Sequence, residues 1–116
     1  MKGLAALLVA VSLGSGAVLV GGCVHRSSPA EPPPPAAVIV TARNVAFTPQ
    51  SATIHTGETV AWRFDDGVIA HDVSGAGWHS PVRTSGYYTH VFDAPGTFAY
   101  RCTIHSGMDG SVVVTP

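Results

Sequence analysis

Alternating apolar and polar side chains predict that most of this chain folds into short β-strands. Apolar residues recur at every second position in three segments, 59–64, 97–102 and 111–115, which is typical of strands with one buried face. Further strands are expected over 38–42, 52–56, 70–74 and 87–92, with Gly, Pro and Asp at the turns between them. No segment favours a long helix. Seven or eight short strands with turns at this spacing predict an all-β, two-sheet Greek-key sandwich.

The first 37 residues have a different pattern and are expected to lie outside the folded domain. An uncharged apolar run from Leu4 to Val20 follows Lys2; it is short and ends in small residues, as in a secretory signal. The run closes with Leu19-Val-Gly-Gly-Cys23. This resembles the lipobox of bacterial lipoproteins, in which the cysteine is acylated and becomes the new N-terminus. We therefore expect a signal peptide over 1–22 and a lipid on Cys23. A plain cleaved signal that leaves Cys23 a bystander is the alternative.

Residues 23–37 are rich in Pro, Ala and Ser and cannot bury a core, so they predict an extended tether. The folded domain is expected over 38–116, which is small but sufficient to fold alone. The chain has a formal net charge of −1 at pH 7, a balance that argues against nucleic acid, which requires a clustered basic surface. We expect an extracytoplasmic monomer anchored to the cell membrane through Cys23, with a soluble periplasmic or secreted protein as the alternative.

Three side chains with metal-binding chemistry, Cys102, His105 and Met108, lie three residues apart after the predicted strand 97–102. Cys102 is the only cysteine of the predicted domain, and an unpaired thiol in a secreted protein requires an explanation. Pairing it with Cys23 would use a residue at a signal cleavage site. A thiolate, an imidazole and a thioether on one loop, with a second imidazole from elsewhere, are the ligands of a blue-copper electron-transfer centre. His71 is the candidate for that second imidazole. Zinc is disfavoured because a thioether is a poor ligand for it.

The alternation also predicts where this chemistry lies. Phe98, Tyr100 and Cys102 share the inward face of one strand, so the cysteine sulfur is expected at one end of the sandwich. The loop that follows passes His105 and Met108 around the same end. A metal ion there would be shielded from solvent but close to the surface.

Other residues with similar chemistry are expected to have ordinary roles. His55 and His90 lie in predicted strands and His79 lies in a predicted loop; each is expected to be a surface or partly buried side chain rather than a metal ligand. Asp65 and Asp66 are expected to form a solvated turn.

Three segments, 56–62, 71–73 and 92–114, together resemble the cupredoxins, and the short Cys-x-x-His-x-x-Met loop is especially similar to that of the amicyanins. The resemblance implies that His71, Cys102 and His105 are equatorial ligands of one type 1 copper ion and that Met108 is the long axial ligand. Asp72 stands where Asn often follows the first histidine, which leaves the hydrogen bonding around the cysteine sulfur open. Ile104 stands where Pro often precedes the second histidine.

The favoured function is therefore a membrane-tethered blue copper protein that carries single electrons between redox partners. In the family it resembles, the partners dock near the loop histidine, here His105. A copper-binding or copper-delivery lipoprotein without an electron-transfer role is the alternative, but such a protein would be expected to present a Met-rich or His-rich surface. An enzyme of the copper-oxidase or nitrite-reductase type is disfavoured because the chain is too short for a second domain. A metal-free immunoglobulin-like adhesion module is disfavoured because it would not explain why the four candidate ligands occur together in one small domain.

Overall fold

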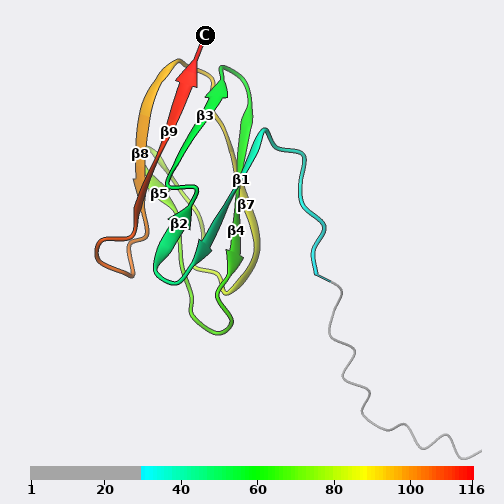
Figure 1. Ribbon diagram of the computed structural model, residues 1–116, viewed down its shortest axis with the longest axis vertical. Coiled ribbons are helices and arrows are strands. Elements are labelled where there is room, and N and C mark those ends of the chain that lie inside the picture. The colour runs from blue at the N-terminus through cyan, green and yellow to red at the C-terminus, as the bar shows by residue number, and fades with distance from the viewer. Residues whose placement is uncertain (1–29) are drawn as a thin grey trace, which may run out of the picture.

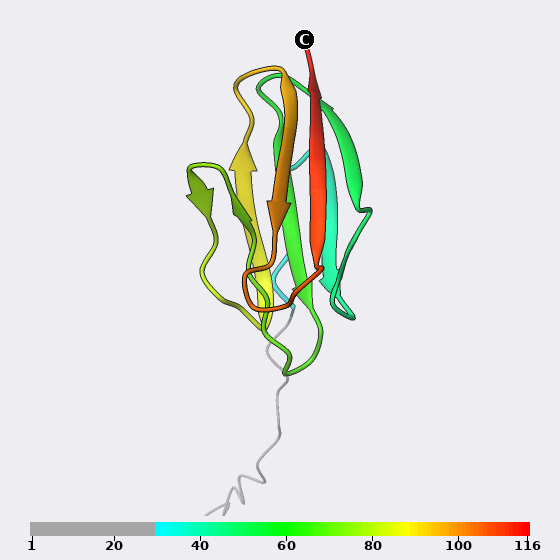
Figure 2. The same cartoon turned by 90° about the vertical axis from the view of Figure 1, so that its left-hand side faces the viewer.

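The computed structural model describes residues 30–116, which form two β-sheets packed face to face (Figures 1 and 2). The strand order is β2-β1-β4-β7 in the first sheet and β3-β9-β8-β5-β6 in the second. The strands of this part of the chain are β1 Val38–Arg43, β2 Ala46–Thr48, β3 Ser51–His55, β4 Thr59–Asp65, β5 Ser74–Gly75, β6 Trp78–His79, β7 Ser85–Val91, β8 Gly96–Arg101 and β9 Asp109–Thr115. The predicted all-β, two-sheet sandwich is confirmed. The predictions for the signal peptide 1–22 and for Cys23 lie outside the described residues.

The segment 70–74 differs from the prediction because it is not a strand. His71 forms only an isolated antiparallel bridge with Arg83, and the short strand β5 begins after it. A turn closed by a hydrogen bond from the Ile69 N–H to the Asp66 carbonyl, 3.0 Å long, precedes His71. The chain therefore bends around the end of the sandwich where the alternation predicted extended backbone.

Two further strands are too short for alternation to reveal. β2 has three residues, and β6, at the edge of the second sheet, has two. Trp78 and His79 thus lie in a strand where a loop was expected. Among residues 30–116, no helix is long and apolar enough to cross a membrane.

The core lies between the two sheets and centres on Trp62 of β4, which is fully buried. Its ring meets Tyr100 of the opposite sheet edge to face, with 5.2 Å between the ring centroids. Trp78 and Phe92 pack against the same indole. Burial of each large side chain stabilises the fold by roughly 1.5–3 kcal/mol. This aromatic core fixes the position of β8, which leads directly to Cys102.

Two glycines bring the backbone of the second sheet close to these rings. A Cβ on Gly110 would collide with the ring of Tyr100, and a Cβ on Gly75 would collide with Trp78. Gly75, Tyr100 and Gly110 are neighbours in register across β5, β8 and β9. One large ring in this row therefore lies between two positions that have no side chain.

The two ends of the sandwich have different connections. The β4–β5, β6–β7 and β8–β9 connections lie together at one end, here called the loop end (Figure 2). At the opposite end, here called the turn end, backbone hydrogen bonds close the connections: Thr56 N–H to the Thr115 carbonyl, Gly57 N–H to the Phe92 carbonyl, and Phe92 N–H to the Glu58 carbonyl. All candidate metal ligands belong to the loop end.

Candidate metal centre

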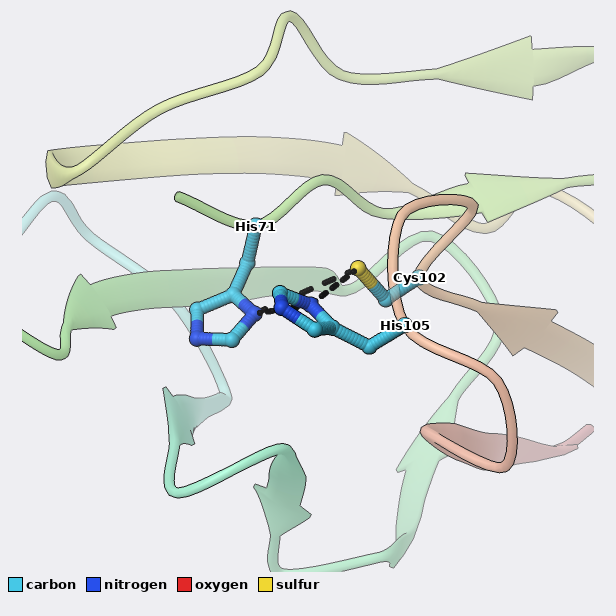
Figure 3. A group of neighbouring side chains, drawn as sticks. All are labelled: His71, Cys102 and His105. Atoms are coloured by element: carbon cyan, nitrogen blue, oxygen red, sulfur yellow. Dashed lines mark hydrogen bonds between the residues drawn. The ribbon is translucent and has the colours of Figure 1, made fainter. Parts of the chain in front are cut away.

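His71, Cys102 and His105 come together at the loop end with their ligand atoms facing one another (Figure 3). The two Nδ1 atoms lie 3.1 Å apart. Cys102 Sγ lies 3.6 Å from His105 Nδ1 and 4.0 Å from His71 Nδ1. His71 and Cys102 are buried, whereas His105 keeps part of its surface exposed. The three side chains thus form a small triangle of one sulfur and two nitrogens.

This triangle has the dimensions of a metal site. A triangle with these sides contains a point roughly 2.1 Å from all three corners, close to the bonds of about 2.0–2.3 Å that imidazole and thiolate make to a d-block ion. Two imidazoles and a thiolate in a trigonal arrangement are the equatorial ligand set of a blue-copper centre. The three side chains therefore fit the group that the sequence predicted.

The loop from Cys102 to Met108 is closed by its own backbone hydrogen bonds. The Cys102 N–H donates to the Met108 carbonyl over 2.9 Å, and the Met108 N–H donates to the His105 carbonyl over 3.4 Å. The side chain of Met108 is 1% exposed and belongs to the core cluster next to Cys102. The closed loop thus presents Cys102 and His105 from one short segment and holds the thioether of Met108 inside the domain.

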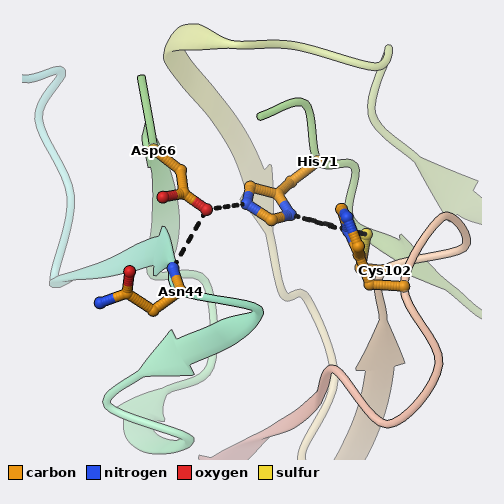
Figure 4. Close-up of polar contacts among 5 residues, drawn as sticks. Asn44, Asp66, His71 and Cys102 are labelled. Carbon is orange, nitrogen blue, oxygen red and sulfur yellow. Dashed lines mark hydrogen bonds and ion pairs between the residues drawn. The ribbon is translucent and has the colours of Figure 1, made fainter. Parts of the chain in front are cut away.

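Asp66 holds His71 from the side opposite the triangle (Figure 4). Its Oδ2 atom accepts a hydrogen bond from His71 Nε2 over 2.8 Å and a second from the Asn44 N–H over 3.1 Å. A proton on Nε2 leaves Nδ1 free to bind a metal, and such carboxylate partners fix the orientation of metal-binding histidines. The hydrogen bond with His71 is the main reason that the pKa of Asp66 lies below its ordinary value.

The sequence prediction of a solvated Asp65–Asp66 turn is therefore wrong for Asp66. Asp65 does lie at the surface, where its carboxylate is 3.4 Å from Arg63 in an exposed ion pair. Asp66 instead has only a tenth of its side chain exposed and contacts His71. The signal that was missed is chemical: a metal-binding histidine needs a partner for its second nitrogen, and an acidic residue five positions upstream is a candidate.

Asp72 connects the two segments that carry the ligands. Its carboxylate accepts hydrogen bonds from the Thr103 N–H over 2.6 Å and from the Thr103 hydroxyl over 2.5 Å. Burial raises the pKa of Asp72, but these two bonds and the Cys102 thiol outweigh it, so the net pKa lies below the ordinary value. The residue after His71 is thus tied to the residue after Cys102, which gives Asp72 a structural role that the sequence had left open.

The remaining histidines of the described domain lie away from this cluster. His55 of β3 has its Nδ1 2.9 Å from the Thr115 hydroxyl, and His79 of β6 is exposed. His90 of β7 stacks on Trp78 with 4.4 Å between ring centroids. Within residues 30–116, His71, Cys102 and His105 are the only group of His, Cys, Asp and Glu side chains gathered closely enough to hold a metal ion.

Comparison with known proteins places this site in a family. No protein-family model matches the chain. Amicyanin-alpha of Methylorubrum extorquens is 34% identical over 83 residues, which span 65% of this chain and 69% of that protein. The chain belongs to the amicyanin-like cupredoxins.

Solved structures of this cupredoxin type have the same fold. A methionine-to-leucine variant of oxidized amicyanin is 26% identical with a TM-score of 0.61, over 68% of this chain and 82% of that one. A proline-to-glycine variant of amicyanin in its reduced Cu(I) form at pH 4 is also 26% identical, with a TM-score of 0.64 over 73% and 87% of the two chains. A purple cupredoxin from Nitrosopumilus maritimus, 24% identical, shares the fold with a TM-score of 0.62, over 67% of this chain and 99% of that one.

The ligand geometry and the family together confirm the predicted cofactor. This cupredoxin has a type 1 copper site formed by His71, Cys102, His105 and Met108. Amicyanin-like cupredoxins are non-enzymatic proteins, and this membership confirms that the chain is not an enzyme.

Proposed function

We propose that this cupredoxin is a membrane-tethered extracytoplasmic carrier that passes single electrons between redox partner proteins. The observation that carries the proposal is the triangle of His71, Cys102 and His105, whose ligand atoms already have the spacing of a metal site. Bound copper would supply a one-electron Cu(II)/Cu(I) couple. Side chains that are held in place by the fold move little when the charge of the ion changes, which favours rapid electron transfer.

The surface around His105 supports docking of a partner at the loop end. His105 is the one histidine of the triangle with an exposed portion. Four large apolar side chains are also exposed on the loops of this end, Val68 at 93%, Ile69 at 45%, Val82 at 58% and Ile104 at 47%. Exposed apolar side chains that gather on one part of a surface often mark a protein interaction site. A partner seated at the loop end would approach the exposed portion of His105.

The burial of the ligands disfavours the copper-delivery alternative. Cys102 is 3% exposed and Met108 is 1% exposed, so an acceptor protein has no direct access to either sulfur. Transfer of the ion itself would require the loop to open, whereas transfer of an electron requires only contact near His105.

Tethering is proposed from the sequence alone, through a lipid on Cys23. Each buried methylene of an acyl chain contributes roughly 0.8 kcal/mol to membrane affinity, so a multiply acylated cysteine would hold the protein firmly. Mass spectrometry of the native N-terminus tests this step. A terminus other than a modified Cys23 would leave a soluble periplasmic or secreted carrier.

The electron-transfer proposal is tested by spectroscopy and voltammetry of the copper-loaded protein. The expected result is an intense visible thiolate-to-copper band that disappears on one-electron reduction and returns on oxidation over many cycles. A bound copper ion that is lost on reduction, or that gives no such band, would contradict the proposal and favour copper handling.

A further inference from the structure

The described part of the tether runs along the outside of the first sheet from one end of the sandwich to the other. At the turn end, the Ala37 N–H donates to the Thr59 carbonyl over 2.9 Å. At the loop end, Glu31 reaches the start of β7: a Cβ on Gly86 would lie 2.8 Å from Glu31 Oε2. The cyan segment in Figure 1 therefore extends toward the loop end, although the first strand begins at the turn end.

The contact at the loop end has a charged and a steric component. Ala30 and Glu31 line one side of a hollow of about 430 Å³, and Arg63 and Arg83 line another part of it. Gly86 has a φ of 85° and no side chain to fill the space. A Cβ there would also lie 3.4 Å from Arg83 Nη1, so the carboxylate of Glu31 and the guanidinium of Arg83 approach the same point. The two groups, both in the described part of the chain, form no ion pair, and exposed opposite charges at such a separation attract one another weakly.

The position of this contact biases where the anchor lies. Eight residue steps separate Cys23 from Glu31, which span at most about 29 Å when fully extended. The two ends of the sandwich are separated by a seven-residue strand, roughly 23 Å long. A tether free from Ala37 onward would allow every orientation of the domain. Only a nearly fully extended segment would carry the anchor from Glu31 across the roughly 23 Å to the turn end, so a tether held at Glu31 favours positions of the anchor nearer the loop end.

Building on the proposed lipid on Cys23, we infer that the docked tether turns the copper-binding loop end toward the membrane and presents it to a redox protein of that same membrane. The occupant is a protein and not the bilayer itself, because the loop end carries the exposed charges of Arg83, Arg101 and Asp109 beside its apolar side chains. Burying such charges in lipid is costly, whereas an apolar centre with a charged rim is typical of protein interfaces.

Energy transfer between the protein and the membrane surface tests the orientation. The lipidated, copper-loaded full chain is placed on vesicles that carry an acceptor dye on the lipid headgroups. A donor dye is attached to Val68→Cys at the loop end or to Asp93→Cys at the turn end; Cys102 is buried and bound to copper, so labelling is confined to the new thiol. The expected efficiency is several-fold higher from position 68 than from position 93. Equal efficiencies, or the reverse order, would overturn the inference.

A charge reversal tests whether Glu31 causes the orientation. Glu31→Lys places two like charges beside Gly86 and is expected to bring the two efficiencies close to each other. The double variant with Arg83→Glu restores opposite charges and is expected to restore the difference. If Glu31→Lys leaves the difference unchanged, the tether contact does not orient the domain.

Two further readouts separate this inference from the proposals on which it rests. A strong blue shift of an environment-sensitive dye at position 68 on vesicles would place the loop end inside the bilayer and overturn the protein partner. An unmodified N-terminus in mass spectrometry would overturn the tethering itself. A lipidated chain with the wrong order of efficiencies would overturn the orientation alone and leave the electron carrier standing.

Discussion

The two ends of the sandwich show two ways of closing the same pair of sheets. At the turn end, the connections are short and are held mainly by bonds between backbone groups, such as those that join Gly57 and Phe92. At the loop end, side chains connect the segments: Asp66 contacts His71 and the Asn44 N–H, and Asp72 contacts Thr103. Apart from Gly57, whose φ of 86° favours glycine, the turn end therefore depends less on side-chain identity than the loop end does.

This difference follows from what each end must position. Backbone hydrogen bonds can close a connection, but they cannot place a ring nitrogen within a few tenths of an ångström of a defined point. That task requires a second side chain that holds the first, as in metal sites generally. Substitutions at the loop end should thus change copper binding and spectra, and matched substitutions elsewhere should change stability alone.

The largest effect is expected from Cys102→Ser. A hydroxyl cannot replace the thiolate donation that defines this class of site, so the intense visible band should be lost completely while circular dichroism still shows the β-sandwich. His71→Ala should weaken copper binding in the same way. An unchanged spectrum and copper content in His71→Ala would mean that another histidine, such as His79 or His90, is the real ligand.

Asp66→Ala should have the next largest effect, compared with its neighbour Asp65→Ala. Removal of a carboxylate that orients a metal-binding histidine typically costs about 10–100-fold in metal affinity, and chelator competition would measure it. Asp65 takes part only in an exposed ion pair with Arg63, so its removal should leave copper affinity unchanged. Equal losses in the two variants would show that general surface charge, and not the contact with His71, is responsible.

A pair of Thr→Val substitutions compares the two ends directly. Thr103→Val removes a hydroxyl bonded to the buried carboxylate of Asp72 and is expected to lower stability by about 1.5–3 kcal/mol. It should also shift the visible band. Thr56→Val removes an exposed bond to the Thr115 carbonyl at the turn end, with an expected loss below about 1 kcal/mol and no spectral change. Denaturant unfolding and absorption spectra of both variants would decide this.

The smallest effect concerns His90, near the turn end. Burial against Trp78 and Phe92 lowers the pKa of His90 below its ordinary 6.5, although Asp93 opposes the shift. The unfolded chain then takes up the proton more readily than the folded one, so stability should fall as pH drops below about 6.5 and level off below the folded pKa.

Melting temperatures of the copper-loaded protein between about pH 7 and pH 5 would measure this effect, which is expected to be under about 4 °C. His90→Phe should remove that part of the decline, and Asp93→Asn should enlarge it because the opposing charge is gone. A decline that is the same in all three proteins would exclude His90 as its source.

Much of the fold and the ligand triangle follows from local patterns in the sequence. The alternation around Trp62 and Tyr100 predicts strands with one buried face, and those residues are buried in the sandwich. The spacing from Cys102 to Met108 predicts a loop that carries several ligands, and backbone hydrogen bonds within that loop close it. Such features depend on neighbours in the chain, so a single sequence contains them.

The contacts that hold the triangle could not be predicted in the same way. The pairing of Asp66 with Asn44 joins residues 22 positions apart, and that of Asp72 with Thr103 joins residues 31 positions apart. Both depend on how the loops meet at one end of the folded sandwich. The failure of the predicted strand 70–74 has the same origin, because tertiary position overrides the local pattern there. Most of the contacts that were missed join residues far apart along the chain, but the contact of Asp66 with His71, five positions apart, was also missed because it depends on the chemistry of a metal-binding histidine and not on the local pattern.

The row of Gly75, Tyr100 and Gly110 has a consequence for the sequences that this fold can accept. Because a side chain at position 110 would occupy the space of the Tyr100 ring, the two positions must change together: a larger residue at one requires a smaller residue at the other. Position 75 is linked to Trp78 by the same exclusion of volume. During evolution, a substitution at one member of such a pair would therefore be accompanied by a substitution at the other. A recombined chain that inherits β8 from one parent and β9 from another would fail whenever the pair is broken.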